Sequence, residues 1–385
     1  MMAVTIRWTS GLPKTVTTAA DDGALKKHRT EGHGWQVLAG IRPAAGEGLA
    51  GSGRTIRYNK ASFSRCSART TNWWKGTTMN IKEIRAACSQ YRVVLEPDEN
   101  TPEWWAGAPS VTRGDNGEFF LAARMREGKS PRGRRGYEVR ILSSGDGVGF
   151  APVNRIGRDA AGVIGFERPA IVRDPRNGAY RLYGCCAFED GWGIIRFQDA
   201  AHPKDFDPAK WQVVLKAENF ADGFNHTAGY KDPFIFWDRD RWRMFVIGYD
   251  RVERAYQFVS SDGTKWEPAS DRPALENTGW HSFFTRPACV LPLSIGYLLV
   301  YEGSTILWRD PDYNIATGLA YSPDMETFID LTPDEPLLKS TTPGLYHTWR
   351  YSHWVHVGEE VYVYFEAARP NATNEIRLAT FRAAR

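Results

Sequence analysis

The sequence predicts an all-β protein, and three observations support this. Aromatic residues and glycines are abundant in the 385 residues, with 15 Trp, 16 Tyr, 19 Phe and 36 Gly, a mixture typical of strands and tight turns. Helical patterns are almost absent after residue 90. A unit of two apolar strands joined by a turn, usually preceded by proline, recurs five times between Ala108 and Phe365.

The spacing of these units predicts how they are arranged. Pro109, Pro169, Pro233 and Pro287 are 60, 64 and 54 residues apart, and His353 follows 66 residues after the last of them. A period near sixty that contains only strands is typical of radial blades around a central channel. We therefore expect a five-bladed β-propeller with a mostly disordered N-terminal extension.

The N-terminal segment, residues 1–78, differs from the rest in charge. It holds 12 Lys/Arg and 4 Asp/Glu, whereas the remainder holds 37 and 41. Because the segment lacks strand or helix periodicity, we interpret it as a basic, disordered extension. Met79 is then the natural beginning, and residues 79–385 form the propeller. The alternative is a basic arm with its own partner. The remainder has no basic excess, so no nucleic-acid partner is expected.

The remaining elements follow in order along the chain. Residues 81–89 predict a short helix, and residues 91–95 predict a strand that completes the last blade and closes the ring. The paired strands of the five blades are expected within residues 108–123, 166–183, 230–246, 285–301 and 351–365. Third strands with a Ser-x-Asp tail follow in residues 255–268 and 317–328. We interpret Asp262 and Asp324 in these tails as turn formers.

Composition disfavours several classes of protein. No run of eighteen apolar residues is present, so no membrane span is expected. The amino terminus lacks the apolar core of a signal peptide, which favours a cytoplasmic protein. The five cysteines, with Cys185 next to Cys186, form neither a disulfide framework nor a zinc motif. We expect no metal and no cofactor.

Charged residues occur where the predicted blades meet the channel. The first strand of a blade lines the channel and the second runs antiparallel to it, so the start of one and the end of the other share a face. Buried charges are costly unless they pair or serve a ligand, which makes this face the candidate site. The residues that open first strands are Ala108, Glu167, Arg168, Lys231, Asp232, Thr285, Arg286, Ser352 and His353. The residues that close second strands are Arg124, Glu189, Asp190, Tyr249, Asp250, Glu302 and Glu366.

The third unit resembles known families. Its residues Tyr230-Lys231-Asp232-Pro233-Phe234-Ile235-Phe236-Trp237, followed by residues 241–248, resemble the Arg-Asp-Pro blade of glycoside hydrolase family 32. They are also similar to the Asp-Pro blades of family 43 and to the Glu-Asp-Pro blade of the family 130 mannoside phosphorylases. The resemblance spans roughly residues 100–385. It implies a five-bladed propeller with its active site in the central funnel.

The resemblance also implies residue roles. In these families an aspartate at the register of Asp232 is a transition-state or acid-modulating residue, or the proton donor. Residues 352–355, Ser-His-Trp-Val, are similar to a family 43 motif, which suggests that His353 meets a central water or ion. The chain departs from the families elsewhere. Gly107 and Ala108 stand where families 32 and 43 place an aspartate nucleophile or base, and Thr285-Arg286 stands where family 43 places its acid glutamate.

Hydrolysis of a glycosidic bond needs two carboxyl groups, one that donates a proton and one that activates water or attacks the sugar. We expect Asp232 and Glu167 to form this pair, with Glu302 as the nearest replacement or helper. Which of them donates the proton stays open. The expected substrate is an oligosaccharide or glycoside, a furanoside by analogy with families 32 and 43.

Other side chains are expected to bind the substrate. The tryptophans that could stack on sugar faces are Trp104, Trp105, Trp280 and Trp354. His226 and His281 lie in loops before predicted blade entrances. Arg168, Arg286 and His281 on one face could hold phosphate instead, so a phosphorylase of the mannoside phosphorylase type is the first alternative. A sugar-binding propeller without catalysis is the second.

Overall fold

The computed structural model describes residues 81–128, 136–189, 191–217, 229–249 and 252–382. Residues 81–382 form one compact unit. The predicted extension, residues 1–78, lies outside the described residues. None of the helices in the described part of the chain has the length and apolar character that crossing a bilayer requires.

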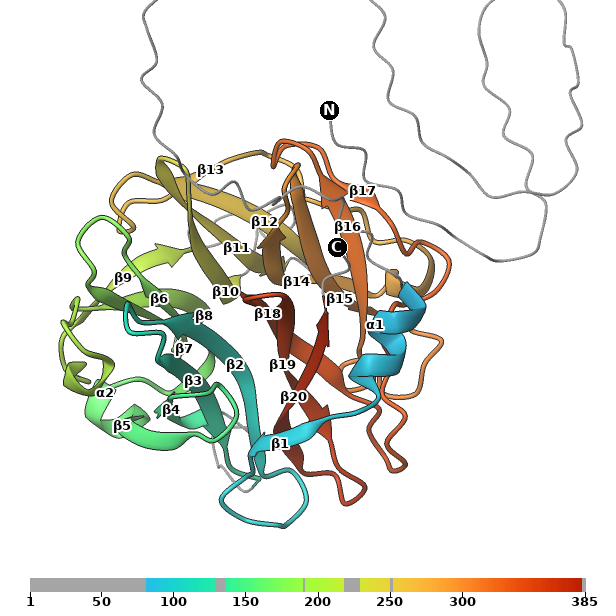
Figure 1. Cartoon of the computed structure of the whole chain (residues 1–385), viewed down its shortest axis with the longest axis horizontal. Coiled ribbons are helices and arrows are strands. Elements are labelled where there is room, and N and C mark those ends of the chain that lie inside the picture. Colours follow the sequence, from blue (N-terminus) through green and yellow to red (C-terminus); the bar gives the residue numbers. More distant parts are fainter. Residues whose placement is uncertain (1–80, 129–135, 190, 218–228, 250–251, 383–385) are drawn as a thin grey trace, which may run out of the picture. The chain divides into compact units, whose positions relative to one another are not determined.

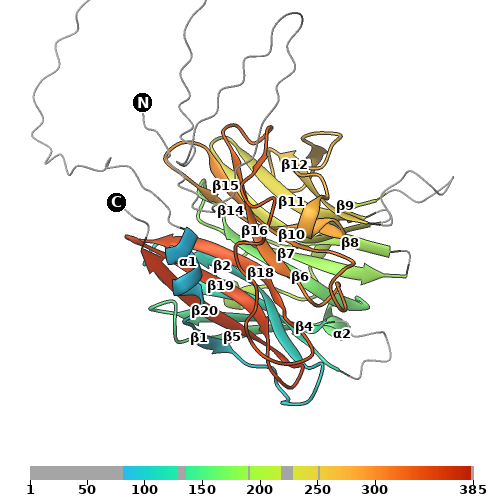
Figure 2. The ribbon, with the colours of Figure 1, turned by 90° about the vertical axis from the view of Figure 1, so that its right-hand side faces the viewer.

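The described residues are nearly all in strands and loops, which confirms the all-β prediction. The helices are short: α1 is Ile81–Cys88, as predicted, α2 is Arg158–Ala161, and two 3-10 turns are η1 (Pro203–Asp205) and η2 (Gly279–His281). Helix α1 packs against β20 (Asn374–Arg382) (Figure 2).

Within the described residues, the strands pair as five antiparallel sets of four. The first three sets are β2 (Trp105–Arg113), β3 (Phe119–Arg126), β4 (Gly136–Ser144) and β5 (Ala151–Gly157); β6 (Gly165–Arg173), β7 (Tyr180–Phe188), β8 (Gly191–Phe197) and β9 (Trp211–Lys216); and β10 (Gly229–Asp238), β11 (Arg241–Tyr249), β12 (Glu253–Ser260) and β13 (Glu267–Pro268). The last two sets are β14 (Phe284–Pro292), β15 (Tyr297–Ser304), β16 (Ala316–Ser322) and β17 (Ile329–Asp330); and β18 (Trp349–Val357), β19 (Glu360–Ala368), β20 and β1 (Arg92–Leu95).

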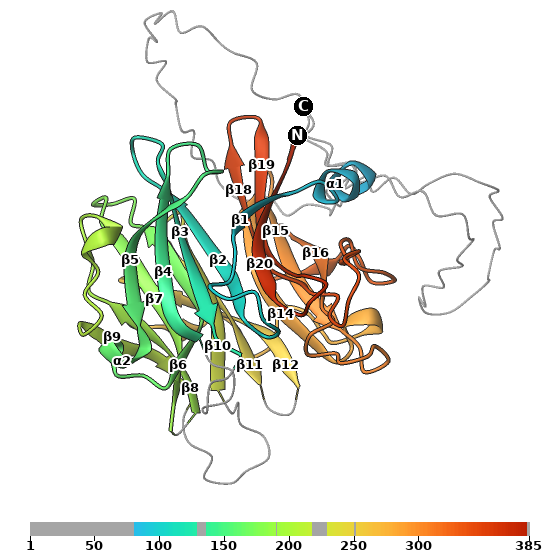
Figure 3. The ribbon, with the colours of Figure 1, turned by 90° about the horizontal axis from the view of Figure 1, so that it is seen from below.

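The first strand of the described residues, β1, completes the last set. It runs antiparallel to β20, with Arg92 opposite Leu378 and Val93 opposite Arg377 (Figure 3). This pairing was predicted from residues 91–95. Short pairings also join neighbouring sets, for example between Trp105 and Asn374, so that the strands of the described residues belong to one 20-stranded sheet.

The first strand of each set lies innermost (Figure 1). β2 contacts β6 and β18, β10 contacts β6 and β14, and β14 contacts β18. The apolar core fills the space between consecutive sets. Phe120, Ile141, Phe166 and Leu182 pack between the first and second sets, and other apolar side chains fill the next interface.

Each inner strand carries an irregularity at its entrance. The strand register shifts between Gly107 and Ser110 in β2, and at matching places in β6, β10, β14 and β18. Prolines sit at four of these places, where the missing N–H interrupts the ladder and favours a bulge. Ala108, Asp232 and Tyr351 have φ angles of 52°, 55° and 52°. At two of these bulges the side chains meet, because the hydroxyl of Tyr351 donates a hydrogen bond to Asp232.

The Ser-x-Asp tails form turns, as predicted. The carboxylate of Asp262 accepts hydrogen bonds from the backbone N–H groups of Thr264 at 2.7 Å and Lys265 at 2.9 Å. Asp324 accepts equivalent bonds in the fourth set. Asp146 in the first set does the same, a copy of the motif that the sequence patterns had not singled out.

Candidate active site

Charged side chains from all five sets gather at the entrances of the inner strands. We call them, with one tyrosine, the central cluster: Arg124, Glu167, Arg168, Lys231, Asp232, Glu253, Arg286, Glu302, Arg350, Tyr351 and Glu366. Most of these side chains are buried. Arg286 is paired with Glu302, and Arg350 with Glu366, across neighbouring strands. Antiparallel pairing therefore brings strand starts and strand ends together, as expected.

Asp232 is held rigidly at the bulge of β10. It is 2 % exposed. One carboxylate oxygen accepts a hydrogen bond from the backbone N–H of Arg168 at 3.3 Å, and the other accepts one from the hydroxyl of Tyr351 at 2.8 Å. The carboxylate is thus fixed between the second and fifth sets.

Glu302 lies at the end of β15 and is 1 % exposed. Its Oε1 accepts a hydrogen bond from the N–H of Ser352 at 3.3 Å. Burial raises the pKa of Glu302 to about 7, although Arg168, Arg286 and Arg350 oppose the rise. A carboxyl group with this pKa carries a proton in a large fraction of molecules at neutral pH.

Glu167 has the opposite environment. Its carboxylate forms an ion pair with Arg124. Burial acts to raise the pKa of Glu167, but Arg124, Arg126 and Lys231 outweigh it and lower the pKa to about 2. Its side chain is 12 % exposed, more than that of Arg124. Glu167 is therefore an ionised carboxylate with some access to solvent.

The carboxylate of Glu366 lies beside Gly107, one of the two residues that stand where families 32 and 43 place an aspartate. A Cβ on Gly107 would overlap the Glu366 carboxylate, and the N–H of Ala108 donates to the same oxygen at 2.9 Å. Arg124 and Arg350 form ion pairs with this carboxylate at 2.9 and 2.7 Å. The side chain is fully buried, so its contacts are with protein groups alone.

Glu253 and Tyr351 were missed by the sequence reasoning. Glu253 opens β12 and bridges Lys231, at 2.8 Å, and Arg286. Burial acts to raise the pKa of Glu253, but these two cations lower it to about 2. A third strand starts at the same face where the second ends. The rule used for first and second strands would therefore have identified Glu253 if it had included the first residues of third strands. Tyr351 takes the bulge position one residue before the predicted Ser352 and His353.

The two predicted arginines are already engaged. Arg168 is fully buried, and its guanidinium donates to the backbone carbonyls of Pro287, at 3.1 Å, and Ala288. Arg286 is 8 % exposed and pairs with Glu253. Arg168 therefore joins the second set to the fourth across the middle of the molecule.

His353 lies beside Phe234, with ring centroids 5.4 Å apart. Burial, together with the charge of Arg168, lowers the pKa of His353 to about 3, so the ring is neutral at pH 7. Its Nδ1 accepts the N–H of Val111 at 3.3 Å. Among the described residues, no group of three His, Cys, Asp or Glu side chains could hold a metal ion.

Trp280 and His281 pack inside the fourth set. The indole N–H of Trp280 donates to the carbonyl of Thr332 at 2.6 Å, and its ring stacks on Tyr301. His281 is 1 % exposed and contacts Thr285 at 2.9 Å and Asp330 at 3.2 Å. Both side chains are thus occupied by protein partners.

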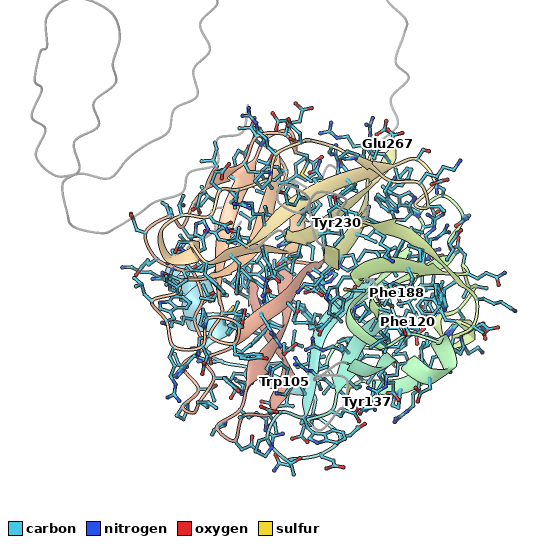
Figure 4. All side chains as sticks on the ribbon, turned by 180° about the vertical axis from the view of Figure 1, so that it is seen from behind. Trp105, Phe120, Tyr137, Phe188, Tyr230 and Glu267 are labelled. Atoms are coloured by element: carbon cyan, nitrogen blue, oxygen red, sulfur yellow. The ribbon has the colours of Figure 1, made fainter. Side chains whose placement is uncertain are left out.

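Trp105 lies where β2 meets the last set (Figure 4). It is 1 % exposed, and its indole N–H donates to the carbonyl of Ala372 at 3.1 Å. Trp354 is also buried, whereas Trp104 is partly exposed. His226, Asp190 and Asp250 lie outside the described residues.

Two cavities lie beside the loops that precede β16 and β18, and the larger one is also lined by α1. One of about 230 Å³ is lined by Trp308, Asn314, Lys339 and His347 among others, and one of about 400 Å³ by Arg85, Trp308, Lys339 and Trp349 among others. Neither lining includes a residue of the central cluster.

Solved structures share this fold. A glycoside hydrolase aligns with a TM-score of 0.60 at 14 % identity, covering 79 % of this chain and 95 % of that one. An α-L-arabinofuranosidase from Lactobacillus brevis aligns at 0.54 and 14 %, covering 74 % and 93 %. The β-1,2-mannobiose phosphorylase from Listeria innocua aligns at 0.53 and 13 %, covering 75 % and 94 %. No family model and no curated protein matches the chain.

These relatives are glycoside hydrolases and phosphorylases of the propeller type. The resemblance to propeller glycoside hydrolases and phosphorylases, inferred from the segment around Asp232, is thus confirmed at the level of the fold. At 13–14 % identity, the likeness to these structures concerns the fold alone.

Proposed function

We propose that the chain is a carbohydrate-active enzyme, a glycoside hydrolase whose substrate binds at the central cluster. The five antiparallel sets are then the five blades of a propeller, and the entrances of the inner strands line its funnel. The fold shared with glycoside hydrolases supports this proposal. So does the concentration of buried carboxylates at one place, since such charges are retained at a cost.

The observation that carries the proposal is the contrast between Glu302 and Glu167. The pKa of Glu302 is raised to about 7 by burial, and that of Glu167 is lowered to about 2 by its cations, which outweigh the effect of burial. Carboxyl groups whose environments separate their pKa values are suited to acid and base roles in one site. We assign the proton donor to Glu302 and the ionised partner to Glu167.

In the proposed reaction, Glu302 protonates the oxygen that leaves the sugar. Glu167 activates a water molecule or attacks the anomeric carbon, and the positive charge that develops on the ring is stabilised by nearby carboxylates. Asp232 is one of these. Its fixed orientation between Arg168 and Tyr351 suits transition-state stabilisation better than proton transfer.

A phosphorylase is the second candidate. One of the similar folds is a mannobiose phosphorylase, and Lys231 and Arg286 are cations of the cluster whose side chains are 19 % and 9 % exposed. Phosphate would then replace the attacking water. Arg168 and His281, which the sequence suggested as phosphate ligands, already bind protein groups. We therefore favour hydrolysis.

The test is turnover of a panel of aryl furanosides and pyranosides, with and without inorganic phosphate. Hydrolysis without phosphate is expected, with a rate that falls as pH rises through about 7, because Glu302 then loses its proton. Glu302→Gln is expected to lower kcat by about 10²–10⁴-fold. Glu326→Gln, an exposed carboxyl in a turn, is the control and should leave the rate unchanged.

Chemical rescue tests whether each carboxylate takes part in the reaction. Azide or formate should restore part of the activity of Glu167→Ala and Glu302→Ala, because a small anion can replace a missing carboxylate. Turnover that strictly requires phosphate would favour the phosphorylase. Sugar binding without turnover on any member of the panel would show that the protein is not an enzyme for these substrates.

A further inference from the structure

Arg126 is a buried cation beside the central cluster. It is the last residue of β3 and is 8 % exposed. Its Nε is buried without a hydrogen-bond partner. Within the described residues no carboxylate forms an ion pair with it, whereas Arg124, Arg286 and Arg350 each have one. Arg126 is attracted to Glu167 through space, but a buried guanidinium without a direct ion pair still carries a desolvation cost that an anion would offset.

The ring of Trp105 stacks on the guanidinium of Arg126. The group lies over the ring of Trp105 at 4.1 Å, and the guanidinium of Arg350 lies over the same ring at 5.0 Å. Tyr313 and Tyr346 meet Trp105 edge to face, with centroids 5.5 and 6.4 Å away. Figure 4 shows Trp105 at the junction of the first and last sets. Stacking on an aromatic ring leaves the edge of a guanidinium available to a ligand.

The charged side chains around Arg126 also favour binding of an anion, because basic groups are in excess. With Arg126 added, the basic side chains of the cluster are Arg124, Arg126, Arg168, Lys231, Arg286 and Arg350, against the acidic Glu167, Asp232, Glu253, Glu302 and Glu366. Burial lowers the pKa of Arg126 to about 10, as expected for a cation short of compensation. Since Glu302 is partly protonated at neutral pH, the excess of positive charge is larger than the residue count indicates.

We propose that Arg126 binds an oxyanion of the substrate complex, either the carboxylate of an acidic sugar or a phosphate. A guanidinium donates two parallel N–H bonds to either group, which gives both charge compensation and orientation. The proposal rests on the function proposed above, because it places the anion next to Glu167 in the same site. It makes an anionic substituent a determinant of substrate choice.

Binding of matched small probes to the full chain tests this. Glucuronate, glucose and inorganic phosphate are compared by calorimetry and by the rise in Tm that a ligand of the folded state produces. Glucuronate or phosphate is expected to bind more tightly than glucose. Arg126→Met is expected to lower the affinity for that anion about tenfold or more. Arg241→Met, an exposed arginine at the start of β11, should bind like the wild type.

Each outcome has one meaning. Loss of glucuronate binding in Arg126→Met identifies an acidic sugar as the source of the oxyanion, and loss of phosphate binding identifies phosphate. Unchanged affinity for both anions, or no preference over glucose, overturns the proposal. If Arg126→Met does not fold, Arg126→Lys is tested instead. This variant keeps the charge but not the paired N–H groups, so an affinity equal to that of the wild type also overturns the proposal. Hydrolysis of neutral glycosides by the wild type would leave the proposed function intact in that case.

Discussion

Glu167 and Glu302 are both buried glutamates in one cluster, yet their pKa values move in opposite directions. Glu167 faces a guanidinium directly, so attraction to Arg124 and its neighbours exceeds the cost of burial. Glu302 accepts one backbone N–H, and burial dominates. At the scale of residues, a cation in direct contact decides whether a buried carboxyl group is ionised.

This contrast predicts how Glu302 affects stability. Between about pH 4.5 and pH 7 the folded chain keeps a proton on Glu302 that the unfolded chain releases. Stability therefore falls as pH rises through this interval, and the loss is complete above about pH 7. Glu302→Gln cannot ionise, so it should raise the free energy of unfolding at pH 8 by about 1–3 kcal/mol.

The measurement is urea unfolding of the wild type and Glu302→Gln at pH 5 and pH 8. The increase in the free energy of unfolding caused by Glu302→Gln should be clearly larger at pH 8 than at pH 5. The exposed Glu326→Gln serves as the control and should show no such difference. An equal effect of Glu302→Gln at the two pH values would mean that the carboxyl is not protonated in the folded state.

At the scale of elements, the bulges at the strand entrances matter most. Ala108 has a φ of 52°, a left-handed conformation that costs a residue with a Cβ about 1–2 kcal/mol. The strain persists because the N–H of Ala108 binds the buried Glu366 and because the ladder is interrupted next to Pro109. Asp232 and Tyr351 also have positive φ angles in other sets, and their side chains hydrogen-bond to each other, as expected where bulges redirect side chains.

Two glycine substitutions in β2 test this strain. Ala108→Gly should be more stable than Ala106→Gly by about 1–2 kcal/mol, because glycine relieves the left-handed strain at 108 and only loosens a regular strand at 106. Both alanines are fully buried, so the loss of a methyl group is matched. The comparison uses the midpoints of urea unfolding. Equal destabilisation by the two changes would contradict a strained bulge.

At the scale of the whole molecule, the chain is joined to itself across nearly its full described length. β1 pairs with β20, almost 300 residues later, and Val94 packs with the apolar cluster that includes Tyr364, Ile376 and Leu378. Such a pairing protects a sheet edge and makes the last set depend on the start of the described chain.

A charge on each face of β1 tests this dependence. Val94→Asp should lower the free energy of unfolding by about 2–4 kcal/mol, because it places a carboxylate in the apolar cluster. Val93→Asp is the matched control, since Val93 is 46 % exposed, and should cost less than about 0.5 kcal/mol. Thermal and urea unfolding give both values. Equal effects would mean that β1 is not part of the cooperative fold.

The periodic features of this protein could be predicted from its amino-acid sequence. Alternating apolar strands, prolines at intervals near sixty and Ser-x-Asp turns are local patterns, and they predicted the paired strands, the turns at Asp262 and Asp324, and the strand at residues 91–95. They also directed attention to Asp232, because a proline after a charged residue marks a strand entrance. Local geometry suffices for such features, since few residues specify each one.

Which side chains meet could not be predicted from the sequence. A shift of one residue at a bulge changes the face to which a side chain points, so Tyr351 rather than Ser352 or His353 contacts Asp232. Arg168 turns to the carbonyls of Pro287 and Ala288, more than a hundred residues away. Glu253 reaches its cations from a third strand. These contacts depend on how the five sets pack around one centre, which no local pattern in the sequence encodes.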